Sequence, residues 1–324
     1  CIQNNCIQKQ RHYMQKLIGD KECKNKKISE FLFSKFNGLT KNTLYKAFRK
    51  KDIRINNVKI SEDMAVHLND VITIYIVDDL LYKNIKIPKV YEDDNILIVD
   101  KPSDIEVVGS DSVTSIFEKE YSFISPCHRL DRNTTGLLLF AKNKETLNIL
   151  LDKFRNKEIE KHYLAKIYNS SKIVQNYKIQ KSSALSSNRI NDCKLQLKEG
   201  VTQTLTAYLF KDNKKSLVYI SDTPKKGYVK IETSFTVLEK NEKENYYLLD
   251  VELHTGKTHQ IRAHLAHIGL PIIGDGKYGI NEINKKFGCK TQQLRSYKLK
   301  FNFITDAGIL NYLNGKEVQL SLPK

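Results

Sequence analysis

Residues 127–143 read CHRLDRNTTGLLLFAKN, a charged segment followed by an uninterrupted apolar run. The run 137–141 is too short for a stable helix, so we predict a buried strand with the charged residues in a loop before it. That loop presents one carboxylate, Asp131, between Arg129 and Arg132. Loops on a rigid scaffold often carry function, and flanking guanidinium groups favour an ionised carboxylate. The pattern suggests a nucleophile or base, although a solvated loop with surface ion pairs is the alternative.

This segment resembles the H-R-L-D-x-x-T-S-G-L-L signature of the RluA-type pseudouridine synthases, which isomerise uridines in ribosomal or transfer RNA. Thr135 stands where the family usually has serine, and the hydroxyl is kept. The resemblance implies that Asp131 is the catalytic carboxylate. It also implies that His128, Arg129 and Arg132 contact RNA, with Arg129 filling the gap that an everted nucleotide leaves.

The composition is that of a globular protein with a strong positive charge. The 324 residues are 40% hydrophobic and 28% charged, enough for two domains with their own cores. The formal net charge of +17 predicts a polyanionic partner, and RNA, DNA or an anionic membrane surface would each fit. We find no apolar run of membrane-spanning length and no leader, so we expect a cytoplasmic protein that does not associate with membranes.

Residues 27–77 predict a small RNA-binding module. Apolar residues at helical spacing indicate two short helices, and alternating residues after them indicate a small β element. The exposed side of the second helix carries Lys46, Arg49 and Lys50. This arrangement resembles an S4 RNA-binding domain, with Lys51 at a position where the S4 pattern has glycine. A basic face without a specific partner is the alternative.

The other predicted boundaries rest on composition. We interpret residues 1–26 as an N-terminal tail and the polar, lysine-rich segment 78–89 as a linker. Residues 90–324 then form the catalytic domain. Within it, residues 168–230 show only weak alternation, and we interpret them as further sheet with an insertion.

A second motif lies at residues 154–165, which read FRNKEIEKHYLA. It resembles the F-x-x-x-x-V-x-K-x-Y-L-A element of the same family, whose tyrosine corresponds to Tyr163. A phenol ring can stack on an extruded uracil and also offers an oxygen. A tyrosine in an alternating strand would otherwise indicate core packing.

A third motif lies at residues 255–279, which read TGKTHQIRAHLAHIGLPIIGDGKYG. It resembles the family's T-G-R-T-H-Q-I-R element, with Lys257 in place of the first arginine. We predict a helix capped by Thr258, with Arg262 near its start. The resemblance implies that Arg262 pairs with Asp131 and that Lys257 contacts RNA.

Two other interpretations of this motif are less consistent with its spacing. A phosphate-binding P-loop would need glycine five residues before Gly256, where Val251 stands. A zinc site would use the histidines of the segment, but no pair at i, i+4 encloses a glutamate, and we predict no metal. These histidines are His254, His259, His264 and His267.

We therefore predict an α+β protein. A small S4-like domain of two helices and a short β element precedes a pseudouridine synthase catalytic domain with a mixed, mainly antiparallel sheet. The resemblance implies isomerisation of specific uridines in RNA by a monomer that uses no cofactor, nucleotide or metal, with Asp131, Tyr163 and Arg262 as catalytic residues. The expected substrate is large-subunit ribosomal RNA of the 23S type, free or in a pre-ribosomal particle. The alternatives are transfer RNA as substrate, or a non-catalytic S4-type assembly factor.

Overall fold

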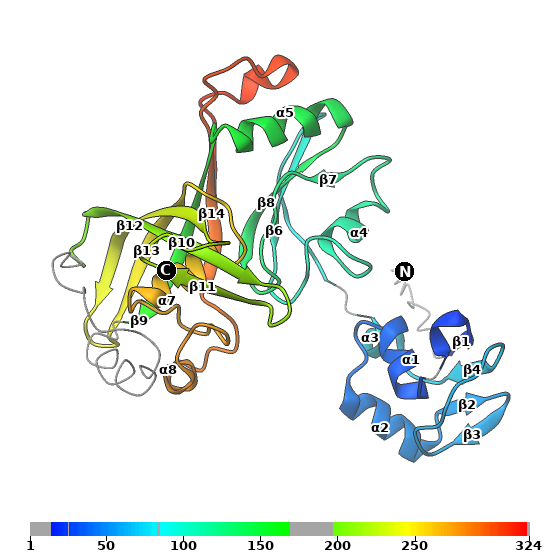
Figure 1. The fold of residues 1–324 in the computed structure, drawn as a ribbon. Helices are drawn as coiled ribbons and strands as arrows, with labels where there is room; N and C mark the ends of the chain where they lie inside the picture. Colours follow the sequence, from blue (N-terminus) through cyan, green and yellow to red (C-terminus); the bar gives the residue numbers. More distant parts are fainter. Residues whose placement is uncertain (1–13, 25, 83–84, 169–196, 323–324) are drawn as a thin grey trace, which may run out of the picture. The chain divides into compact units, whose positions relative to one another are not determined.

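The computed structural model describes residues 14–24, 26–82, 85–168 and 197–322 (Figure 1). It divides into two compact units, Cys1–Lys86 and Ile87–Lys324. No helix among the described residues has both the length and the apolar composition needed to cross a bilayer.

The first unit combines short helices with a four-stranded antiparallel sheet in the order β1-β4-β2-β3. Helices and strands share one buried apolar cluster, to which Phe31 and Phe48 contribute. Lys51 ends the second helix at φ +57°, the left-handed conformation for which the S4 pattern has glycine. The elements are β1 (Gln15–Ile18), η1 (Lys21–Cys23), α1 (Ile28–Lys35), α2 (Lys41–Lys50), β2 (Ile53–Ile55), β3 (Val58–Ile60), β4 (Val71–Ile74) and α3 (Asp78–Leu81).

Both predicted boundaries of this unit are wrong. The predicted tail 1–26 includes β1, which pairs with β4, and Cys23, which is buried in the core; residues 1–13 lie outside the described part. The predicted linker 78–89 includes α3, whose Leu81 is also buried in the core. These elements have four residues or fewer, so their sequences carry too few positions for a period to be visible.

Helix α2 separates its apolar and basic residues as predicted. Leu44 and Phe48 face the core, whereas Lys46, Arg49 and Lys50 are exposed. The basic face therefore exists, and its contact with RNA stays a prediction.

The second unit is built on a mixed sheet of eleven strands among the described residues, in the order β11-β10-β12-β13-β9-β14-β8-β6-β5, with β15 beside β14 and β7 beside β8. The pairings between these strands are antiparallel except that of β8 with β14, so the predicted α+β class and mainly antiparallel sheet are confirmed. The strands are β5 (Lys89–Glu92), β6 (Ile96–Lys101), β7 (Ser125–Pro126), β8 (Thr135–Ala141), β9 (Ile159–Tyr168), β10 (Thr202–Asp212), β11 (Leu217–Ser221), β12 (Val229–Asn241), β13 (Tyr246–Leu253), β14 (Leu294–Phe301) and β15 (Glu317–Gln319). The helices are α4 (Val113–Phe117), α5 (Lys144–Arg155), α7 (Gln260–His267), α8 (Asn281–Lys286) and η2 (Gly308–Leu313).

The region 168–230, interpreted as further sheet with an insertion, does contain further strands of the main sheet. Strands β10 and β11 fall within it, and β12 begins at Val229; all three belong to the main sheet. The weak alternation seen in this region is therefore a true strand signal. Residues 169–196 lie outside the described part.

The backbone packing at Gly136 explains why the first motif has glycine at this position. Gly136 lies at φ +105° in β8 and pairs with Ser296 of the parallel strand β14. A Cβ atom at this position would lie 2.0 Å from the carbonyl oxygen of Ser296, so a side chain here would push the two strands apart. The close approach fixes the loop that precedes β8, which carries Asp131.

A buried ion pair stabilises the second unit near the end of α5. The Nζ atom of Lys153 donates to Glu158 at 2.8 Å and to the carbonyl and hydroxyl oxygens of Thr305 at 2.6 Å each. Glu158 also accepts from the backbone N–H of Ile304, so the pair holds the turn after β14 against α5.

Lys153→Met should lower the free energy of unfolding by about 3–5 kcal/mol, because it leaves the Glu158 carboxylate buried without its cation. Urea denaturation measures this loss. Adding Glu158→Gln should recover part of it, since the orphaned charge is then removed. A double variant no more stable than Lys153→Met would contradict this explanation.

Candidate active site

The loop that carries Asp131 is tied down on both sides. The backbone N–H of Thr134 donates to the carbonyl of Asp131 at 3.0 Å, and the Thr134 hydroxyl accepts from Gln292 at 2.6 Å. The buried ammonium of Lys101 donates to the carbonyl of Arg132 at 2.9 Å. Burial lowers the pKa of Lys101 to about 8. The carboxylate therefore stands on a backbone with little freedom.

Arg262 joins Asp131 to a second carboxylate. Its Nη1 donates to Asp131 Oδ2 at 2.9 Å, while its Nε and Nη2 donate to the two oxygens of Asp275 at 2.7 and 3.0 Å. The Asp275 side chain is fully buried, and that of Asp131 is 22% exposed. Burial disfavours ionisation of Asp275, but the hydrogen bonds from Arg262 outweigh it and hold the pKa of Asp275 below its ordinary value. Asp275 thus fixes the guanidinium that orients Asp131.

Tyr163 lies on β9, opposite Ser296 of β14, and is buried. Burial, together with the nearby charge of Asp131, raises the pKa of the Tyr163 phenol above its ordinary value. The phenol is therefore protonated at neutral pH. Asp131, Arg262 and Tyr163 come from three separate motifs and are brought together by the fold.

His259, considered in the sequence only as a zinc candidate, is a neighbour of Asp131. Its Nε2 lies 3.9 Å from Asp131 Oδ2, and its Nδ1 lies 2.8 Å from the hydroxyl of Tyr278. Burial lowers the pKa of His259, which favours the neutral ring. The prediction that Thr258 caps the helix is wrong, because α7 begins at Gln260 after His259 has adopted a left-handed conformation at φ +52°.

A model of the RNA pseudouridylate synthase family matches residues 95–267, more than half of the chain. The matched segment includes Asp131, Tyr163 and Arg262. The chain belongs to this family.

Relatives of the synthase match it along almost all of its length. An uncharacterised RNA pseudouridine synthase of Mycoplasma capricolum subsp. capricolum is 30% identical over 94% of this chain and 97% of its own. A ribosomal large subunit pseudouridine synthase C of Buchnera aphidicola subsp. Acyrthosiphon pisum is 29% identical over 94% of this chain and 92% of its own. The solved structure of human RNA pseudouridylate synthase domain containing 1 shares the fold, with a TM-score of 0.51 and 19% identity over 74% of this chain and 84% of its own.

The arginines beside Asp131 in sequence do not pair with it in the synthase. Arg132 donates to Asp104 at 2.9 Å instead, and both side chains are more than half exposed. The expectation that flanking guanidinium groups hold Asp131 is therefore wrong, since the loop turns them outward and Arg262 takes their place. Arg129 is also exposed. Both arginines remain available to an RNA.

His128 is only partly exposed, and its ring is held by contacts inside the protein. Its Nε2 accepts from the backbone N–H of Leu139 at 3.1 Å, and its ring lies 5.3 Å from that of Phe154. Burial lowers the pKa of His128 to about 3. The ring therefore links the loop to β8, and a contact of His128 with RNA stays a prediction.

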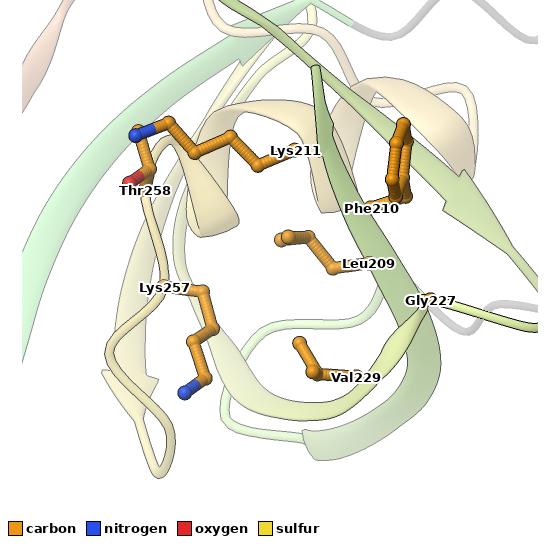
Figure 2. Close-up of a pocket in the computed structure, with 7 residues that line it drawn as sticks. All are labelled: Leu209, Phe210, Lys211, Gly227, Val229, Lys257 and Thr258. Atoms are coloured by element: carbon orange, nitrogen blue, oxygen red, sulfur yellow. The ribbon is translucent and has the colours of Figure 1, made fainter. Parts of the chain in front are cut away.

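A cavity of about 300 Å³ lies beside the start of α7. Figure 2 shows Leu209 and Val229 between the side chains of Lys211 and Lys257, which enter from two sides. Thr258 also lines the cavity. The cavity combines an apolar floor with two ammonium groups, so it can accept a flat, uncharged group attached to an anion.

The four histidines considered for zinc do not converge. Each has a different partner, and the pairs are His254 with Ser234, His259 with Tyr278, His264 with Thr233 and His267 with Asp222. In the part of the chain that the structure describes, the side chains close enough together to hold a metal ion are those of Glu160, His162 and Glu252. Lys300 lies 3.6 Å from Glu160, and His162 lies 3.0 Å from Asp250, so this group already has protein partners.

Proposed function

We propose that this synthase isomerises uridine to pseudouridine in large-subunit ribosomal RNA, with Asp131 as the reacting carboxylate. The observation that carries the proposal is the pairing of Asp131 with the buried Arg262 beside Tyr163. The ribosomal substrate is supported by the relatives named ribosomal large subunit pseudouridine synthase C, which match most of this chain.

The reaction breaks one bond and makes another without net change of atoms. The N1–C1′ bond of uridine breaks, the uracil turns while still held, C5 joins C1′, the C5 proton leaves and N1 gains a proton. An ionised carboxylate beside the sugar serves either by attacking C1′ or by taking the 2′ proton. Both routes require Asp131, and in both the hydrogen bond from Arg262 Nη1 orients the carboxylate.

Tyr163 supplies a flat face for the turning uracil and an oxygen at the site. Because its phenol is protonated at the outset, it receives the C5 proton only with concerted loss of its own, or donates a hydrogen bond to a uracil oxygen. The ring and the hydroxyl therefore contribute separately to binding and to chemistry.

Tyr163→Phe keeps the ring and removes the oxygen. We expect kcat to fall on the order of 100-fold, the lower end of the range for general acid–base groups, while KM changes only a few-fold. Single-turnover and steady-state tritium release from [5-³H]uridine-labelled RNA measures both. Tyr297→Phe is the matched control, because Tyr297 is a buried tyrosine on the adjacent strand that contacts His162 instead. Equal losses in the two variants would argue against a role for the Tyr163 hydroxyl.

The RNA is proposed to contact both units. In the first unit, the exposed Lys46, Arg49 and Lys50 of α2 offer a row of cations for phosphates. In the second unit, the exposed Arg129 lies in the loop that carries Asp131, where it can occupy the space left by the everted uridine.

Tritium release on separate transcripts of large-subunit ribosomal RNA and transfer RNA tests the proposal. We expect release on the former and none on the latter, with the modified position mapped by carbodiimide primer extension in cellular RNA with and without the gene. Release only on transfer RNA would reject the ribosomal substrate. RNA binding without release on any RNA would favour the non-catalytic assembly factor.

A further inference from the structure

Among the residues that the structure describes, Lys161 is a half-buried cation without a carboxylate partner. It lies on β9 two residues before Tyr163, so both side chains leave the same face of the sheet. No acidic side chain lies within 4 Å of its Nζ among the described residues, and the Nζ atom lies 4.8 Å from the centroid of the Phe154 ring. A lysine that loses solvent without gaining an anion is costly, so such a group calls for an external partner.

The surroundings of Lys161 confirm that its charge is uncompensated inside the protein. Burial alone lowers the pKa of Lys161 to about 8. Its positive charge also lowers the pKa of His128, whose buried Nδ1 has no hydrogen-bond partner in the described residues. The neighbours below Lys161 are therefore an aromatic ring and a neutral imidazole, and neither can neutralise it.

Gly256 lies beside the ammonium group of Lys161 and leaves it uncovered. A Cβ atom built on Gly256 would lie 3.8 Å from Lys161 Nζ, and no other atom outside its chain neighbours would lie within 4 Å. The backbone at Gly256 does not require glycine, because its φ is not in the left-handed region. The loop that carries Gly256 is held in place by Gln260, whose Oε1 accepts from the Thr255 hydroxyl and the Lys257 N–H. Glycine here therefore keeps the ammonium uncovered.

We propose that Lys161, left accessible at Gly256, binds a phosphate of the RNA strand next to the everted uridine. The site rests on the proposed function, since the phosphate belongs to the RNA that presents its uridine to Asp131. Lys257 follows Gly256 directly and lines the cavity of Figure 2 together with Lys211. The strand would then pass from Lys161 along the loop towards that cavity, with the phosphate at Lys161 closest to the reacting nucleotide.

The test measures RNA binding rather than turnover, so that it is independent of catalysis. In an Asp131→Asn background, Lys161→Met should weaken binding of a large-subunit ribosomal RNA transcript about tenfold, the loss expected when one charge-assisted hydrogen bond is removed. The slope of log Kd against log salt should fall by about 0.7–0.9, the value for one phosphate. Lys161→Arg should retain both values, because the charge and the reach are kept.

Lys166→Met is the matched control. Lys166 is a half-buried lysine of the same strand, and its Nζ lies 3.7 Å from the Tyr246 ring centroid. This variant should leave affinity and salt slope unchanged. Gly256→Val is a second probe that keeps the lysine and covers it, and it should weaken binding as Lys161→Met does. Thermal denaturation checks that each variant folds.

The pH dependence separates a phosphate contact from a packing role. Binding by the parent protein should weaken as pH rises through about 8, where free Lys161 loses its charge, and Lys161→Arg should lack this component. His128 is neutral throughout this range and Tyr163 is protonated, so neither group contributes to this pH dependence. The proposal is overturned if Lys161→Met leaves the slope of log Kd against log salt unchanged. It is also overturned if Lys166→Met loses as much RNA affinity as Lys161→Met. If Lys161→Met lowers the salt slope but the parent protein releases no tritium from any RNA, the proposed function is rejected and the phosphate site is retained.

Discussion

Replacing Asp131 with asparagine should lower the rate of pseudouridine formation on the order of 10⁴-fold, because either route to product uses this carboxylate. Asparagine keeps the size of the side chain and can still accept a hydrogen bond from Arg262 Nη1, which donates to Asp131 at 2.9 Å in the parent protein. Single-turnover tritium release measures the rate, and filter binding measures the affinity. We expect affinity for the RNA transcript to change by less than a few-fold.

The Asp131→Asn experiment needs a control variant and a measurement of folding. Asp104→Asn provides a control carboxylate in a neighbouring loop, which pairs with the exposed Arg132 and should leave the rate within a few-fold. Full activity of the Asp131→Asn protein would refute the assignment of this residue. Loss of both binding and thermal stability would instead indicate that the carboxylate supports the fold.

Asp275→Ala should cost about 3–5 kcal/mol of unfolding free energy and most of the activity, although Asp275 is not proposed to touch the substrate. The substitution leaves Nε and Nη2 of the buried Arg262 without acceptors, and it also strips the backbone N–H of Tyr278 of its acceptor. Arg262 is then free to leave Asp131. Urea denaturation and steady-state kinetics at saturating RNA measure the two effects.

The pH dependence of stability distinguishes the buried Arg262–Asp275 pair from an exposed ion pair. Because the folded-state pKa of Asp275 is depressed, its contribution is complete above the ordinary value of about 4 and is lost as pH falls through the depressed pKa. The difference in stability between parent and Asp275→Ala should therefore shrink in acid. Asp104→Ala, which breaks an exposed pair, should cost less than about 1 kcal/mol. Similar losses from both alanine variants would mean that Arg262 does not depend on Asp275.

Much of the fold was visible in the sequence because its strongest signals are long or chemically specific. The apolar run after Asp131 is a buried strand, and the two helices of the first unit lie where the helical spacing placed them. Elements of three or four residues, such as β1 and α3, were missed, because the packing that stabilises them joins segments far apart in the chain.

The site could be predicted only in part for a similar reason. Motif resemblance indicated the pairing of Arg262 with Asp131, whereas sequence proximity pointed to Arg132, which turns away to Asp104. Asp275 was quoted within the third motif without a role, and only its bidentate contact with Arg262 reveals it. Position along the chain does not fix which guanidinium meets which carboxylate.

The parallel pairing of β8 with β14 has a consequence for the order of folding. Gly136 fits against Ser296, so the catalytic loop gains its final support from a strand that is synthesised about 160 residues later. Contacts this distant in sequence form late, because a long loop must close before they contribute stability. During translation, the nascent chain would therefore hold Asp131 unsupported until β14 has left the ribosome, and the enzyme would become competent only after that.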